Sequence, residues 1–267
     1  MMTNELFTQV TQAVIRAGRL FADRDRAGKV KEKGRTDFVT AVDLAVQEQL
    51  KADLAVLAPD VQLMGEEKDN SGLDLTKRVW VLDPVDGTTN LVHDFHNSAV
   101  SLALAESGQV TMGMVYNPYT QELFFARLGR GAFRNGQPIR VSPARTLAES
   151  LCSVGTNPSR RDQADQTFAW MRAVYDRCHD VRRVGAASIE LCYVACGRLE
   201  GYVEQGLKPW DYAAAMLIIQ EAGGVLTDEK GNSLSPFSGG AVIASNGHIQ
   251  EELLTLLLGK ERANHCI

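Results

Sequence analysis

The stretch WVLDPVDGTTNLVH, residues 80–93, decides how this chain is interpreted. It begins as an apolar strand and then places two aspartates, Asp83 and Asp86, on either side of a Pro-Val pair. Pro84 cannot donate a hydrogen bond to a strand ladder, so we expect it to turn the backbone. Both carboxylates and the Val85 carbonyl would then face one point. The stretch therefore predicts a buried strand that ends in a cluster of oxygen ligands.

The residues after the second aspartate favour binding of an anion. Gly87 allows the backbone to approach a ligand closely. If a helix starts at Thr88 or Thr89, its free N–H groups and its positive dipole end attract an anion such as phosphate. The alternative interpretation is an Asp-rich turn in which the side chains bond only the local backbone.

Three further segments pass from apolar residues to acidic ones. Asp43 follows FVTAV, Glu66 and Glu67 follow QLMG, and Asp211 follows KPW. Carboxylates brought together at such boundaries raise each other's pKa unless a cation neutralises them. Hard oxygen ligands in this number suit Mg²⁺ or Mn²⁺ rather than zinc, and paired ions with an anion cradle suit hydrolysis of phosphate esters. Taken alone, the Glu pair also fits a solvated turn, and Asp211 also fits a helix N-cap.

The composition argues against several classes of protein. The 267 residues carry a formal net charge of −5, which argues against a broad nucleic-acid footprint. No run of about 18 uncharged apolar residues predicts a membrane span, and no secretory signal pattern opens the chain. The five cysteines are scattered, so we expect a reducing, cytoplasmic location. The short basic pair Arg182-Arg183 is interpreted as a surface or subunit contact.

The pattern of apolar residues predicts alternating helices and strands. Helices are predicted at 5–22, 43–57, 162–178, 186–197, 211–222 and 248–258. Strands are predicted at 61–65 and 79–83, followed by a strand meander over 98–142 with a hairpin turn at Asn135-Gly136. The character of the sequence changes near residue 145. We therefore expect a single α+β domain over 1–267 with two lobes, at about 1–147 and 148–267.

Several segments resemble the signature segments of the inositol monophosphatase family. They are GEE at 65–67, the stretch at 80–93 and KPWDYAAAMLIIQEAGG at 208–224. DFVTAVD at 37–43 and VRRVGAASIELCYVACGRLEGYVEQG at 181–206 match in order and spacing, so the resemblance covers essentially the whole chain. It implies a layered α/β/α/β/α sandwich shared with fructose-1,6-bisphosphatases. It also implies a Mg²⁺-dependent, typically lithium-inhibited phosphatase that is usually a homodimer.

The resemblance implies two or three Mg²⁺ ions in each active site. Glu66, Asp83 and the Val85 carbonyl would hold the first ion. Asp83, Asp86 and Asp211 would hold the second, and a weaker third ion would lie near Glu66.

The resemblance also implies catalytic and substrate-binding roles. Thr88, paired with Asp43, would orient the attacking water, with Glu67 close by, for direct in-line attack without a phosphoenzyme. The backbone N–H groups of Gly87 and Thr88 would bind phosphate oxygens. The residues expected to contact substrate are Glu66, Val85, Asp86, Gly87, Thr88, Gly185, Ala186, Ala187, Glu204 and Asp211.

The sequence leaves the roles of some positions and the identity of the substrate open. Ala186 stands where many relatives carry threonine or serine, and either Lys31 or Lys33 matches a mobile lysine of the family. His93 and His96 are interpreted as a polar rim of the cleft. The alternatives to inositol-1-phosphate are fructose-1,6-bisphosphate, histidinol phosphate, NADP and a 3′-phosphonucleotide. The alternative of another class is a regulatory or scaffold protein that keeps the fold.

Overall fold

The computed structural model describes residues 3–32 and 38–259, with Glu32 described in its backbone only. The helices within these ranges are α1 (Asn4–Gly18), α2 (Arg24–Ala27), α3 (Ala41–Leu57), α4 (Thr88–Val92), α5 (Ala164–Tyr175), α6 (Ala187–Ala195), α7 (Pro209–Glu221) and α8 (Gln250–Leu257), with 3₁₀ turns at Arg19–Ala22, Leu147–Glu149 and Pro158–Gln163. The strands are β1 (Val30–Glu32), β2 (Phe38–Thr40), β3 (Gln62–Gly65), β4 (Val79–Asp86), β5 (Ala99–Glu106), β6 (Gln109–Asn117), β7 (Glu122–Arg127), β8 (Ala132–Arg134), β9 (Gln137–Pro138), β10 (Leu151–Val154), β11 (Asp180–Arg182), β12 (Gly201–Leu207), β13 (Val225–Thr227) and β14 (Gly240–Ser245).

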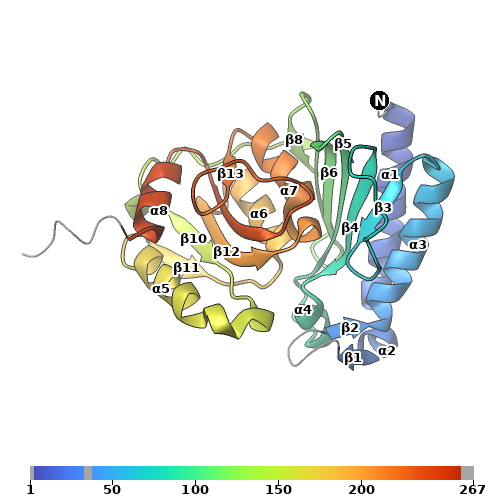
Figure 1. Cartoon of the computed structure of the whole chain (residues 1–267), viewed down its shortest axis with the longest axis horizontal. Coiled ribbons are helices and arrows are strands. Elements are labelled where there is room, and N and C mark those ends of the chain that lie inside the picture. The colour runs from blue at the N-terminus through green and yellow to red at the C-terminus, as the bar shows by residue number, and fades with distance from the viewer. Residues whose placement is uncertain (1–2, 33–37, 260–267) are drawn as a thin grey trace, which may run out of the picture.

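These elements stack as layers in the order α/β/α/β/α (Figure 1). Helices α1 and α3 cover the outer face of a seven-stranded sheet of order β3-β4-β5-β6-β7-β8-β9. Helices α6 and α7 lie between this sheet and a five-stranded sheet of order β11-β10-β12-β14-β13, whose far face is covered by α5 and α8. The predicted α+β layered sandwich is confirmed. The lobe boundary at 147/148 stays a prediction, although one sheet ends at Pro138 and the other begins at Leu151.

Strand β4 carries the decisive stretch, and it differs from the prediction. It does not end at Asp83 but continues to Asp86, and all of its residues are buried. Its pairing with β5 shifts between Asp83, opposite Ser101, and Asp86, opposite Ala99. The strand therefore bulges at Pro84, because proline has no N–H to offer the ladder. The bulge turns the chain toward the acidic cluster without ending the strand.

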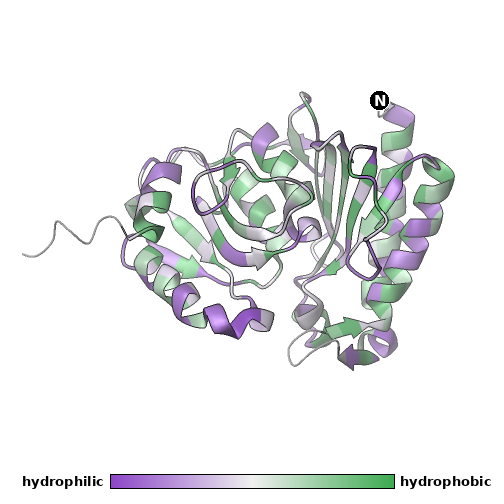
Figure 2. Cartoon of the chain, in the orientation of Figure 1, coloured by the Kyte–Doolittle hydropathy of each residue, from purple (hydrophilic) through white to green (hydrophobic). Residues whose placement is uncertain are grey.

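The middle layer is packed so closely that one position in the sheet requires glycine. A Cβ atom added to Gly113 of β6 would lie 2.2 Å from the carbonyl oxygen of Ala214 in α7. Nearly all of α7 is buried, including its run of three alanines. Figure 2 shows the same trend, with hydrophobic colours in many strands and inner helices and alternating hydrophobic and hydrophilic colours along the outer helices. Small residues on both sides thus allow the sheet and helix to approach at backbone distance.

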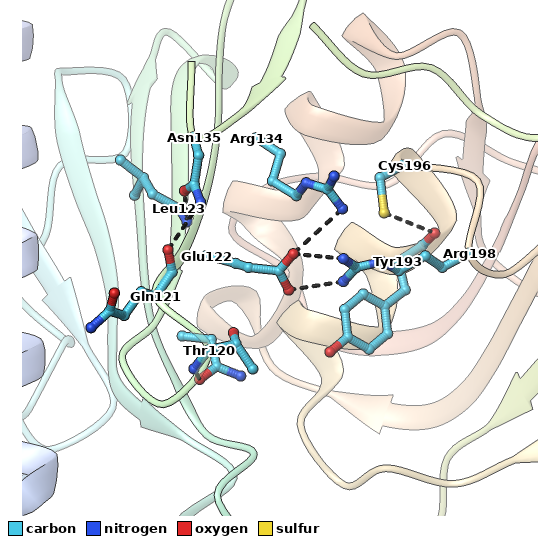
Figure 3. A network of polar contacts seen from close by, with 10 residues as sticks. Thr120, Gln121, Glu122, Leu123, Arg134, Asn135, Tyr193, Cys196 and Arg198 are labelled. Atoms are coloured by element: carbon cyan, nitrogen blue, oxygen red, sulfur yellow. Dashed lines mark hydrogen bonds and ion pairs between the residues drawn. The ribbon is translucent and has the colours of Figure 1, made fainter. Parts of the chain in front are cut away.

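An ion-pair network joins the two halves of the chain across this layer (Figure 3). Glu122 at the start of β7 accepts hydrogen bonds from two guanidinium nitrogens of Arg198, at 2.8 and 2.6 Å, just after α6. Arg134 of β8 approaches the same carboxylate at 3.4 Å. Hydrogen bonding to Arg198 is the main reason that the pKa of Glu122 is lowered. A partly buried bidentate pair of this kind fixes the orientation of α6 relative to the first sheet.

Local predictions hold best where the signal lies in adjacent residues. The hairpin at Asn135-Gly136 is present, and both residues have positive φ, as a type I′ turn requires. The helix predicted at 162–178 is shorter, because a 3₁₀ turn precedes α5 and Tyr175 ends it. Strand β11 was not predicted, since three residues give no periodic signal.

No helix within the described ranges is long and apolar enough to cross a membrane.

Candidate active site

The turn after β4 adopts the conformation that its glycine predicts. Gly87 has φ +86°, in the left-handed region, and it is the N-cap of the short helix α4. The Ser98 hydroxyl donates to the Gly87 carbonyl at 2.8 Å and holds the turn. The helix start expected at Thr88 is therefore present, directly after Asp86.

Thr88 and Asp43 are in direct contact, as predicted. The Thr88 hydroxyl lies 2.9 Å from a carboxylate oxygen of Asp43 and 3.0 Å from the Val85 carbonyl. Asp43 is held at the start of α3 by a capping box, in which the Thr40 backbone N–H donates to it at 2.8 Å. Burial raises the pKa of Asp43, while hydrogen bonds from Thr40 and Thr88 oppose that rise. These contacts join α3, the β4 bulge and α4 at one point.

Asp83 and Asp86 of β4 and Asp211 of α7 influence each other electrostatically. Burial raises the pKa of Asp83 well above its ordinary value, and the charges of Glu66, Asp86, Asp211 and Asp43 add to the rise. Burial likewise raises the pKa of Asp211, with further contributions from Glu66 and Asp86. Burial raises the pKa of Asp86 to about 6, against opposing hydrogen bonds from Ser188. Mutual repulsion of this kind is what a bound cation relieves.

The chain does not hold these carboxylates in a ready-made cage. Within 3–32 and 38–259, no three acidic, histidine or cysteine side chains are close enough together to form a preassembled ion site. All three aspartates are instead engaged with backbone donors: Asp83 accepts the Val85 N–H at 2.9 Å, Asp211 accepts the Lys208 N–H at 2.7 Å, and Asp86 accepts two N–H groups described below. The donor set still fits a hard cation, because it consists of carboxylate oxygens that repel one another. An ion would draw them together from these positions.

The sequence allowed Asp211 to be the N-cap of a helix, but the structure places it within the first turn of that helix. Helix α7 begins at Pro209, and its N-cap is Lys208 rather than Asp211. Asp211 is the third residue of the helix, and its carboxylate reaches back to the N-cap backbone. Pro209 explains the difference, because proline is favoured in the first turn of a helix. Asp211 is therefore not the N-cap residue. Its carboxylate nevertheless contributes to capping, because it accepts the backbone N–H of the N-cap residue Lys208.

Glu66 and Glu67 are placed by a residue that the sequence did not identify. The buried amide of Gln47, on α3, accepts the Glu67 N–H at 3.2 Å and donates to the Glu67 carbonyl at 2.9 Å. A Cβ atom on Gly65 would lie 2.7 Å from this amide, so glycine leaves the space for it. The sequence feature that could have identified Gln47 is its spacing, because it lies one helical turn after Asp43 and therefore on the same face of the helix.

The segment 185–187, predicted to contact the substrate, lies against the Gly87 turn. A Cβ atom on Gly87 would be 3.1 Å from the Gly185 carbonyl and from the Ala186 Cβ. Asp86 accepts N–H groups from Ala187 at 3.2 Å and from Ser188 at 2.7 Å, and it also accepts the Ser188 hydroxyl. The structure thus joins α6 of the second half to the metal-site segment of the first.

Glu204 is buried beneath a glycine. A Cβ atom on Gly155 would lie 2.0 Å from a Glu204 carboxylate oxygen. The Tyr202 hydroxyl donates to the same carboxylate. Burial raises the pKa of Glu204 to about 7, and the charge of Arg183 opposes this rise. Glu204 is therefore an acid whose protonation changes near neutral pH.

The remaining candidates lie outside this cluster or outside the described residues. Lys33 lies outside the described residues, whereas Lys31 is an exposed residue of β1. His96 is exposed, lies 3.1 Å from Asp94 and stacks on Tyr119. The two arginines predicted to form one surface contact have separate partners: Arg182 pairs with Asp180, and Arg183 donates to Thr156 at 3.1 Å.

Comparisons with known proteins show which family and fold the chain resembles. The model of the inositol monophosphatase family matches residues 2–261. The inositol-1-monophosphatase of Rhizobium meliloti is 36% identical over 259 residues, which cover 95% of this chain and 96% of that protein. A fructose-1,6-bisphosphatase/inositol-1-monophosphatase of Thermotoga maritima is 35% identical, with 85% of each chain covered. The crystal structure of the extragenic suppressor protein suhB of Bartonella henselae superposes with a TM-score of 0.88 at 31% identity, covering 97% of this chain and all of that chain.

Proposed function

Because the chain belongs to the inositol monophosphatase family and is a phosphatase, we propose that it hydrolyses inositol-1-phosphate, and related polyol phosphates, with the help of Mg²⁺. The observation that carries this proposal is the coupled set of buried aspartates beside the Thr88–Asp43 pair.

The proposed metal ligands are those that membership of the family implies for these carboxylates. Glu66, Asp83 and the Val85 carbonyl would hold one ion, and Asp83, Asp86 and Asp211 would hold another, with a weaker third near Glu66. Bound Mg²⁺ would neutralise the phosphate charge and favour ionisation of a water and of the leaving oxygen.

The side chains and backbone of the chain itself orient the reaction. The Thr88 hydroxyl can donate to Asp43 and keep a lone pair to accept a hydrogen bond from the attacking water. Asp43 is the group in that chain of hydrogen bonds that can take up a proton, with Glu67 nearby. The backbone N–H groups of Gly87 and Thr88 would bind phosphate oxygens at the start of α4.

The other end of the substrate would contact the second half of the chain. Gly185, Ala186 and Ala187 would line the ring, and Glu204 would bind ring hydroxyl groups. These groups lie next to the Gly87 turn because Asp86 binds the start of α6. A cytoplasmic location, which rests on the scattered cysteines, and a homodimeric assembly, which rests on the family alone, are part of this proposal.

The test is phosphate release from a panel of esters, each measured with Mg²⁺ and with EDTA. The panel contains inositol-1-phosphate, fructose-1,6-bisphosphate, histidinol phosphate, NADP and a 3′-phosphonucleotide. EDTA-sensitive release from inositol-1-phosphate would support the proposal, and release from fructose-1,6-bisphosphate would favour the activity named for the Thermotoga relative. Folded protein that releases phosphate from none of them would favour the regulatory or scaffold alternative.

A further inference from the structure

Five consecutive backbone N–H groups at the start of α6 are bound by only two carboxylates. Asp86 takes the last two, as described above. Glu190, one turn into α6, takes the first three. Its partners are Val184 at 2.9 Å, Gly185 at 3.1 Å and Ala186 at 3.3 Å. Every N–H of the segment 184–188 is therefore occupied, so this helix start offers no free donor to a phosphate.

Glu190 is itself fixed from the neighbouring sheet. Its side chain is 1% exposed, and the Ser153 hydroxyl of β10 donates to it. Ser153 also lies 2.9 Å from the Arg182 carbonyl, at the end of β11. The N-cap of α6 is Ala186, which has no capping side chain, so Glu190 replaces the missing cap from within the helix. The segment 184–186 is thus held from the sheet beneath it.

The segment held by Glu190 touches both parts of the site. The Val184 carbonyl accepts the Asn90 side-chain amide of α4 at 2.9 Å. Gly185 and Ala186 pack against Gly87, where even one added carbon would be crowded. The next two residues along the chain bind Asp86. A shift of 184–186 would therefore move the donors that orient Asp86.

We propose that Glu190 is a positioning residue of the active site. It holds the segment 184–186 so that this segment contacts the substrate ring and the following two N–H groups orient Asp86. The inference deepens the proposed function and rests on it for its catalytic readout. The inference also states that the N–H bonds of 184–186 to Glu190 and those of 187 and 188 to Asp86 depend on each other. This dependence can be measured without any substrate.

The catalytic test compares Glu190→Gln with Glu200→Gln. Glu200 is a matched control, because it is a buried carboxylate in the same half of the chain that accepts one backbone N–H, from Leu151, at 2.6 Å. We expect Glu190→Gln to raise KM for the ester, and the Mg²⁺ concentration for half-maximal activity, by about tenfold or more, the size of a lost bond to a charged group. The Glu200→Gln protein should keep both values within about twofold, even if it loses similar thermal stability.

A milder variant covers the case in which Glu190→Gln does not fold. Ser153→Ala removes one donor to Glu190 and leaves the carboxylate in place. It should raise KM by about three- to fivefold, less than Glu190→Gln, because the carboxylate and its three backbone N–H donors remain. A normal KM and Mg²⁺ dependence in both variants, with reduced stability alone, would overturn the proposal and leave Glu190 a purely structural cap.

Two measurements on metal-free and metal-bound protein separate this inference from the proposed function. Hydrogen exchange followed by NMR should show that Glu190→Gln removes protection from the amides of 187 and 188, which bind Asp86, as well as from 184–186. Calorimetric titration with Mg²⁺ should show weaker binding to this variant. Retained protection at 187 and 188 with unchanged Mg²⁺ affinity would refute the coupling. Wild-type protein that releases no phosphate from any ester would refute only the proposed function.

Discussion

Raising the pH from 5 to 7 in the presence of EDTA should destabilise this protein, whereas carboxylates that are paired with cations act in the opposite direction. The folded-state pKa of Asp86 is about 6, and that of Glu204 is about 7, against ordinary values of 3.8 and 4.5. A carboxyl whose pKa is raised by folding stabilises the folded state while it is protonated. That stabilisation is lost as the pH rises through the folded-state pKa.

The magnitude follows from these two shifts. Asp86 contributes about 1 kcal/mol at pH 5 that is gone at pH 7, and Glu204 contributes about 2 kcal/mol over the same interval. The raised pKa values of Asp83 and Asp211 act in the same direction. The expected loss is thus about 3 kcal/mol, or a fall in Tm of about 5 °C for a chain of this length. The comparison stops at pH 7 because the pKa of the Cys178 thiol is lowered to about 7.

Urea unfolding and thermal melts at the two pH values provide the assay. Saturating Mg²⁺ should reverse the trend, because the ion binds the ionised carboxylates and is displaced by protons. Glu204→Gln should remove about 2 kcal/mol of the pH dependence, whereas the exposed control Glu48→Gln should remove none. Stability in EDTA that stays constant or rises between pH 5 and 7 would refute the account of the buried carboxylates.

Three substitutions test other parts of the structure. Asp83→Asn should reduce Mg²⁺-dependent phosphate release by about a thousandfold or more. It should also raise the unfolding free energy of the metal-free protein at pH 7, because it removes a charge that the neighbouring carboxylates repel, and a lower stability in EDTA would contradict this. Gly155→Ala should raise KM by about tenfold because its Cβ would displace Glu204, and KM equal to the wild-type value would show that Glu204 does not contact substrate. Gly113→Ala should cost about 3 kcal/mol or more in urea unfolding, since its Cβ would overlap the Ala214 carbonyl; a loss below about 1 kcal/mol would mean that α7 moves away easily.

Sequence and structure agree most closely where a few adjacent residues carry the information. The helix start at Thr88 and the hairpin turn at Asn135-Gly136 are both present as predicted. Each depends on the backbone preferences of two to four neighbouring residues. The errors lie at boundaries, such as the bulge at Pro84, where pairing with β5 outweighs the local tendency to end the strand.

The sequence by itself determined the family of this protein and indicated which residues are candidates for its chemistry. The acidic residues after apolar runs, the glycine turn and the order of the signature segments are properties of the chain, and they lead to a metal-assisted phosphatase. The residues that hold this chemistry in place gave no such signal: Gln47 behind Glu67, Gly155 above Glu204, and Glu190 at the start of α6.

Only the tertiary structure decided how the two halves of the chain meet. Asp86 binds N–H groups that follow it by about a hundred residues, and no local pattern can specify a partner at that distance. The physical reason is that these contacts depend on layer packing. The close approach of β6 to α7 and the ion pair between Glu122 and Arg198 help to place the start of α6 beside Asp86, and the hydrogen bonds of the site depend on that placement.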